Sequence, residues 1–153
     1  MKRRASTLYL PPAPDYAGRR RIDTRYACCT RQCLSVRQDL KHRSFALTTG
    51  VLRRFKLLSS GGPAEAHIAL QLFRAVSSLG AQLEEAEVFA SRRDLAAKLV
   101  VALREAREAR YWLRLLATNP DRSHLLQPDI VECTEFIAML TTSVRKLRSS
   151  PDT

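Results

Sequence analysis

The sequence predicts an all-α protein, an antiparallel up-and-down four-helix bundle preceded by a disordered basic tail. From Asp39 onward, apolar residues recur at alternating spacings of three and four, which places them along one side of a helix. Four such segments of about twenty residues follow one another with short breaks, and no segment alternates with the period of two that marks a strand. Four amphipathic helices joined by short loops bury their apolar stripes best as an antiparallel bundle.

The first two predicted helices are separated by a glycine pair. The first runs roughly over residues 39–59 and ends at Gly61-Gly62, a natural C-terminal cap. Pro63 suits the first turn of the second helix, where its missing N–H has no partner to lose. The residues predicted to point inward are Leu40, Leu47, Val51, Phe55 and Leu58 in the first helix and Ile68, Leu72, Ala75, Leu79, Gln82, Ala86 and Phe89 in the second.

The third and fourth helices also carry start and stop signals. In SRRD, residues 91–94, Ser91 is expected to cap the third helix while Asp94 reaches back to it. Asn119-Pro120 ends this helix, and Pro128 is expected to start the fourth after a loop. The predicted core positions are Leu95, Leu99, Ala102, Ala106, Ala109, Leu113 and Leu116 in the third helix and Ile130, Cys133, Ile137, Leu140, Val144 and Leu147 in the fourth.

The charge is concentrated before the predicted bundle. Residues 1–38 hold nine Lys/Arg against two Asp, whereas residues 39–153 hold seventeen Lys/Arg against thirteen Asp/Glu. The first region also lacks a sustained period, so we predict a disordered extension over 1–38, a bundle over 39–149 and a short tail over 150–153. Because the extension stops where the bundle begins, we hypothesise an over-long gene prediction with Leu34 or Val36 as the alternative start.

Several classes of protein do not fit the sequence. No stretch approaches 18 consecutive apolar residues, and the basic N-terminus lacks the apolar segment of a secretory signal, so a cytoplasmic protein is expected. Three cysteines, Cys28, Cys29 and Cys33, do not have the spacing of a zinc site even with His42, and Cys133 suits a core position. No Glu-x-x-His pair, phosphate-binding loop or nucleophile signature occurs, and we expect no enzymatic activity, cofactor or small-molecule substrate.

The second and third helices resemble a known family. SSLGAQLEEAEVFASRRDLAAKL, residues 77–99, followed by EAREARYWLRLLA, residues 105–117, is similar to the 23S rRNA intervening-sequence proteins, also called four helix bundle proteins. The residues that match the family pattern are Ser78, Gly80, Ala81, Ser91, Asp94, Ala97, Lys98, Leu99, Trp112, Leu113, Leu115 and Leu116. Gln82 replaces the family's usual Asn and Leu95 its usual Phe. The likeness spans roughly 110 residues, from Asp39 to about Arg148.

The resemblance implies an up-and-down bundle that assembles into rings, with a pentamer expected, and no established enzymatic activity. The family's relatives include the accessory variability proteins of diversity-generating retroelements, which act beside a reverse transcriptase and contact nucleic acid. This relation is an analogy between folds, and a fold does not determine a function.

REAREARYWLRLLA, residues 104–117, places different chemistry on three faces of one helix. The first face is the predicted core. A second stripe lies about 110° away and suits an oligomer contact, although the same residues also suit a wider intramolecular core. It consists of Val101, Glu105, Glu108, Trp112 and Leu115.

The third face of this helix is basic. Arg104, Arg107, Arg110 and Arg114 can neutralise phosphates, and Arg92, Arg93 and Lys98 add charge near the start of the helix. The alternative is a solvated face, or ion pairs with Glu84, Glu85 and Glu87 of the second helix. Gln82 is expected to be a buried amide that fixes the register of the core.

The sequence as a whole favours a non-enzymatic, oligomeric bundle that binds nucleic acid, either structured RNA or an RNA–DNA intermediate, through backbone charge. The alternative is a protein-interaction scaffold or an accessory subunit of a reverse transcriptase, in which charge serves solubility and steering.

Overall fold

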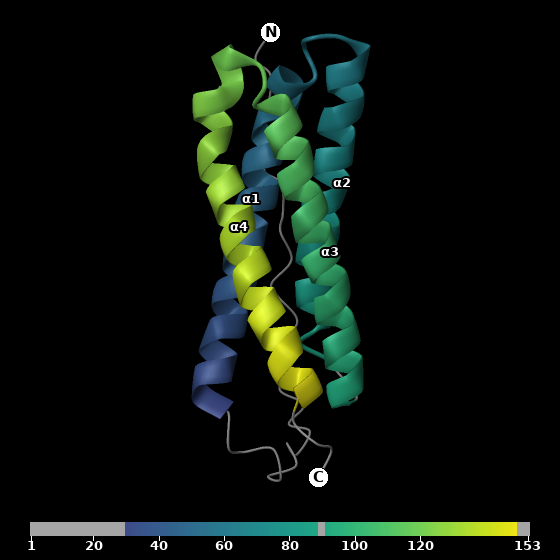
Figure 1. Cartoon of the computed structure of the whole chain (residues 1–153), viewed down its shortest axis with the longest axis vertical. Helices are drawn as coiled ribbons and strands as arrows, with labels where there is room; N and C mark the ends of the chain where they lie inside the picture. Colours follow the sequence, from purple (N-terminus) through teal and green to yellow (C-terminus); the bar gives the residue numbers. More distant parts are fainter. Residues whose placement is uncertain (1–29, 89–90, 150–153) are drawn as a thin grey trace, which may run out of the picture. The chain divides into compact units, whose positions relative to one another are not determined.

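The computed structural model describes residues 30–88 and 91–149. Four helices account for almost all of these residues: α1 (Thr30–Leu58), α2 (Pro63–Glu85), α3 (Arg92–Leu116) and α4 (Pro120–Ser149). No strand occurs within the described ranges. Figure 1 shows the four helices running alternately up and down, with α3 and α4 side by side in front of the fainter α1 and α2. The predicted all-α four-helix bundle is confirmed.

Helix α1 begins at Thr30, nine residues before the start expected from the sequence. Residues 30–38, which the sequence analysis assigned to the extension, are therefore helical. They contain no proline or glycine, and extending an existing helix costs little once its first turn has formed. Residues 1–29 and 150–153, where we predicted disorder, lie outside the described residues.

The core follows the predicted seams closely in α3. All seven predicted positions of this helix are buried, from Leu95 to Leu116, and Leu103 joins them. The alanines at positions 102, 106 and 109 are fully buried, so α3 lies close to its neighbours there. Phe136 of α4 is the largest fully buried side chain among the described residues. In α2, Leu83 is buried, whereas Phe89 lies outside the described residues.

Local signals set two of the helix boundaries as predicted. Gly62 has φ of +122°, a conformation that residues with a Cβ rarely adopt, and it separates α1 from α2. Pro63 is the first residue of α2. At the start of α3, the Ser91 hydroxyl accepts a hydrogen bond from the backbone N–H of Asp94 at 3.1 Å, as an N-cap should.

The start of α4 corrects the prediction. The helix begins at Pro120 rather than Pro128, because the Asn119 side chain accepts a hydrogen bond from the backbone N–H of Asp121 at 3.1 Å and Pro120 fits the first turn. Pro128 lies inside the helix and supplies no N–H to the carbonyl one turn earlier. Arg54 of α1 donates to the neighbouring Leu125 carbonyl at 2.8 Å and pairs with Asp129, so α1 supports α4 at this proline.

Among the described residues, ion pairs connect four of the helix pairs, and one of them joins Arg122 of α4 to Glu65 of α2. Lys41 of α1 pairs with Glu84 and Glu87 of α2, and Lys98 of α3 pairs with Glu85 of α2. Arg43 of α1 binds Glu132 and Glu135 of α4 and lies over the Phe136 ring, with its guanidinium carbon 5.5 Å from the ring centroid.

Candidate nucleic-acid interface

The four arginines predicted to bind nucleic acid have no ion-pair partner among the described residues. Arg104, Arg107 and Arg114 are exposed, and Arg110 is half-buried. Among the residues that the structure describes, none of the four makes an ion pair.

The alternative in which these arginines pair with the acids of α2 is wrong. Lys41 forms ion pairs with Glu84 at 2.9 Å and with Glu87 at 2.6 Å. Lys98 forms an ion pair with Glu85 at 2.5 Å. Hydrogen bonds with Glu87 and Glu84 raise the pKa of the Lys41 ammonium above its usual value, and a hydrogen bond with Glu85 does the same for Lys98. The acids of α2 are therefore neutralised without the arginines of α3.

Two of the additional predicted contacts have structural roles. Arg92 donates hydrogen bonds to the carbonyls of Leu147 and Lys146, both at 3.2 Å, and so satisfies acceptors at the C-terminal end of α4. Lys98 is held by Glu85. Arg93 is exposed and makes no ion pair within the described residues, so it remains a candidate.

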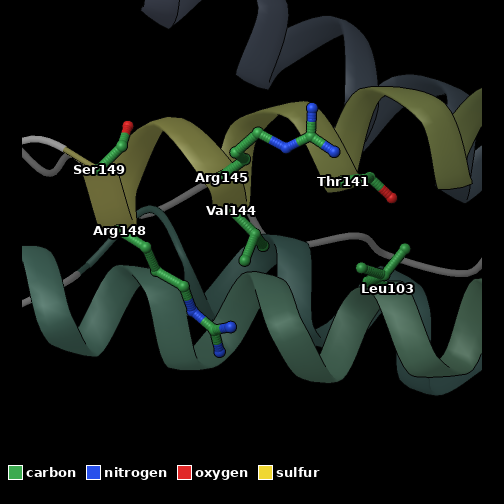
Figure 2. Close-up of a pocket in the computed structure, with 6 residues that line it drawn as sticks. All are labelled: Leu103, Thr141, Val144, Arg145, Arg148 and Ser149. Carbon is green, nitrogen blue, oxygen red and sulfur yellow. The ribbon is translucent and has the colours of Figure 1, made fainter.

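Helix α4 adds two arginines that the sequence analysis missed. A hollow of about 520 Å³ lies where α3 and α4 adjoin, lined by Leu103, Thr141, Val144, Arg145, Arg148 and Ser149. Figure 2 shows Val144 and Leu103 extending into the space between the helices, while Arg148 reaches from α4 across α3 and Arg145 extends along α4. Both arginines are exposed. A signal was available, because Thr141, Arg145 and Arg148 share one flank of the fourth helix at spacings of four and three.

The arginines on the adjoining flanks of α3 and α4 make no ion pair with the described carboxylates. On α3, the acids between Arg104 and Arg114 are Glu105 and Glu108, which belong to the stripe that borders α2; Glu108 is exposed, and Glu105 interacts electrostatically with Arg104. On α4, Asp129, Glu132 and Glu135 lie on the opposite flank, where Arg54 and Arg43 of α1 bind them. Six arginines therefore share one surface, and none of them makes an ion pair within the described residues. We call this surface the arginine face: Arg104, Arg107, Arg110 and Arg114 of α3 with Arg145 and Arg148 of α4.

The stripe predicted as an oligomer contact borders α2. Val101, Glu105, Trp112 and Leu115 are half-buried, and Glu108 is exposed. Trp112 packs against the core, and its indole N–H donates a hydrogen bond to Glu108 at 3.1 Å. Burial, and then the Glu108 charge, raise the pKa of Glu105, although Ser78 of α2 hydrogen-bonds it. The tryptophan thus contributes to its own bundle, and the oligomer contact stays a prediction.

Gln82 is not the buried register residue that we expected. Its side chain is half-buried, whereas the adjacent Leu83 is only 5% exposed and fills the core position. The stretch from Leu79 to Ala86 supports a seam through either residue, and burial of the leucine side chain is favoured because it leaves no amide to satisfy. The register of α2 is therefore set by an apolar residue.

Cys133 is a core residue, as predicted. It is fully buried, and burial raises the pKa of its thiol to about 12. No group of three or more His, Cys, Asp or Glu side chains in the described part of the chain is placed to hold a metal ion. Cys28 and Cys29 lie outside the described residues. None of the four described helices is long and apolar enough to cross a membrane.

Comparison with known proteins gives one informative relative. A solved structure from Bacteroides thetaiotaomicron, a protein of unknown function from the S23 ribosomal protein family, superposes with a TM-score of 0.63 at 29% sequence identity. The alignment covers 71% of this chain and 97% of that chain. No family model and no curated protein matches the sequence. The chain is thus similar in sequence and fold to that protein over nearly all of its length.

Proposed function

We propose that this chain is a non-enzymatic bundle that binds nucleic acid, in the form of structured RNA or an RNA–DNA intermediate, through the arginine face. The observation that carries the proposal is the unequal distribution of charge. Ion pairs hold the basic side chains where α1 meets α2 and α4 and where α2 meets α3, but none of the six arginines of α3 and α4 makes one within the described residues. Guanidinium groups that lack an internal carboxylate are free to contact phosphates in pairs of hydrogen bonds.

Two further points support this proposal. The solved relative belongs to a family named for a ribosomal protein, and the sequence resembles the 23S rRNA intervening-sequence proteins. We also infer that the chain assembles into a ring, for which we propose a pentamer, in the cytoplasm. A ring would multiply the field of the arginine face, because several copies would present the same uncompensated charge to one ligand.

A salt titration tests the proposal on the full chain. Binding of a structured RNA should weaken linearly on a log–log plot of affinity against salt, with a slope that counts the phosphates contacted. The variant Arg107→Gln/Arg114→Gln should lower that slope by about 1 for each arginine removed. The matched control, Arg53→Gln/Lys56→Gln, removes the same charge from exposed positions on α1. If both variants change the slope equally, the arginine face has no special role.

A second candidate function, a protein-interaction scaffold, is favoured by one surface of α1 and α2. Phe45 is 73% exposed and Leu52 56% exposed, and beside them the Phe55 and Phe73 rings meet edge to face at 6.0 Å. Exposed apolar side chains that gather in this way are typical of contacts with another chain. A second copy of this chain is one candidate partner, and a reverse transcriptase is another.

The two functions are separable by experiment. Replacing Phe45 and Leu52 by serine should reduce the mass measured by light scattering if this surface joins copies of the chain, while RNA affinity per protomer stays nearly the same. An unchanged mass, together with retained binding of the purified reverse transcriptase, would assign the surface to neither partner.

A further inference from the structure

Tyr111 lies in the middle of the arginine face. Its side chain is 55% exposed, although it sits next to Trp112, which packs against the core. Arg104, Arg107 and Arg114 stand seven residues before, four before and three after it, and these spacings place all three on the same side of α3 as the tyrosine. The structure therefore combines one accessible aromatic ring with three cationic neighbours.

The tyrosine ring is supported by the ring of the adjacent Trp112. Its centroid is 4.9 Å from that of Trp112, and the two rings meet edge to face at 68°. Trp112 is itself fixed by its packing on the core and by the hydrogen bond to Glu108. A supported ring loses little conformational freedom when a ligand stacks on it, so the free energy of stacking is not spent on ordering the side chain.

The hollow between α3 and α4 lies on the same face at a suitable separation. Leu103 is eight residues from Tyr111, which corresponds to about 12 Å along a helix. Leu103 and Val144 give the hollow apolar walls, and Arg145 and Arg148 provide positive charge beside them. Figure 2 shows both arginine side chains extended from α4. A chain of phosphates that passes Tyr111 thus meets further cations where it reaches the hollow.

An exposed tyrosine ring flanked by arginines should favour unpaired bases over paired ones. In a duplex, each base is already stacked on its neighbours and its faces are closed to protein side chains. An unpaired base can lie on an aromatic ring while arginines bind the flanking phosphates, and such stacking tolerates any base because every base has a flat π face. Phosphate contacts alone would not separate the two forms so strongly.

We propose that the arginine face binds unpaired nucleotides, with one base stacked on Tyr111 and the adjoining phosphates on Arg107 and Arg114. The inference rests on the proposed function and narrows it to single-stranded segments, such as the loops of a structured RNA. We expect binding to be independent of the nucleotide sequence, because stacking and phosphate contacts do not read the edges of the bases.

The experiment compares an oligouridylate with a duplex RNA of the same length, using the full chain and its Tyr111→Ala and Tyr111→Phe variants. Tyr111→Ala should weaken binding of the single strand by about 5- to 150-fold, the range expected from loss of one stacked base, and leave duplex binding nearly unchanged. Tyr111→Phe keeps the ring and should retain the single-strand affinity. Trp112, the single tryptophan of the chain, reports a base stacked beside it through its fluorescence.

The outcomes separate failure of the stacking inference from failure of the proposed function. If both nucleic acids bind with salt dependence but Tyr111→Ala changes neither, the stacking inference is overturned and the proposed function stands. If neither nucleic acid binds the wild-type chain at low salt, the proposed function itself fails. An equal loss for single strand and duplex would show that Tyr111 supports the surface without stacking on a base. Circular dichroism of the variant confirms that α3 remains folded.

Discussion

Replacing Arg122 by alanine tests how strongly α4 is tied to the end of α1. Arg122 is 8% exposed, and its guanidinium donates to the Leu58 carbonyl at 3.2 Å, to the Ser60 hydroxyl at 3.4 Å and to Glu65 of α2. The substitution leaves the last carbonyl of α1 and the Glu65 carboxylate without this donor. Breaking a buried ion pair from one side costs about 3 to 5 kcal/mol.

The lower end of that range applies here. The Glu65 side chain is 27% exposed, so water replaces part of what the arginine supplied. We therefore expect Arg122→Ala to lower the free energy of unfolding by about 3 kcal/mol, measured by urea denaturation with an unchanged dependence on denaturant. The matched control is Arg145→Ala, an exposed arginine of the same helix, which should change stability by less than about 0.5 kcal/mol. A loss below about 1 kcal/mol for Arg122→Ala, the value typical of a surface pair, would refute the reasoning.

Three further predictions concern single side chains. The Cys133 thiol, with its pKa raised to about 12 by burial, should not react with a thiol reagent at pH 8 until the chain unfolds, and rapid labelling of the native protein would contradict its placement. Glu105 has a folded pKa raised above its unfolded value, so stability should fall as pH rises through these pKa values; Glu105→Gln should remove that fall in a pH series of melts. Ser91→Ala should cost about 1 kcal/mol through loss of the α3 cap, and a melting curve identical to wild type would exclude this role.

The periodic part of the fold could be predicted from the sequence. All seven core positions predicted in α3 are buried, because the alternating spacing of three and four belongs to the helix itself and needs no knowledge of its partners. The cap at Ser91 and the break at Gly62 were predictable for the same reason, since each acts within a few residues.

Signals that admit two meanings were resolved only by packing. Asn119-Pro120 ends α3 and starts α4, but only its role as a helix end was predicted. Pro128 resembles a helix start, yet α4 continues through it because Arg54 and Asp129 join α1 to α4 at that point. Gln82 and Leu83 compete for one core position, and the outcome depends on what faces α2 from the other helices.

The candidate site depended on contacts between helices. The four arginines of α3 could be identified from their shared face. The sequence does not predict that Lys41 and Lys98, rather than these arginines, form the ion pairs with the acids of α2. Arg145 and Arg148 belong to the same surface because α4 adjoins α3 there, which is a property of the tertiary structure. Tyr111 and Trp112 are adjacent in the sequence, yet one is exposed and the other packs on the core.

The most direct test of the central claim is to locate the bound nucleic acid on the chain. Photocross-linking of a single-stranded RNA to the full-length protein, followed by mass spectrometry of the peptides, identifies the residues in contact. The arginine face predicts cross-links in residues 104–114 of α3, with Tyr111 among them, and in residues 145–148 of α4. Cross-links confined to residues 1–29, or to the exposed surface of α1 around Phe45, would contradict it.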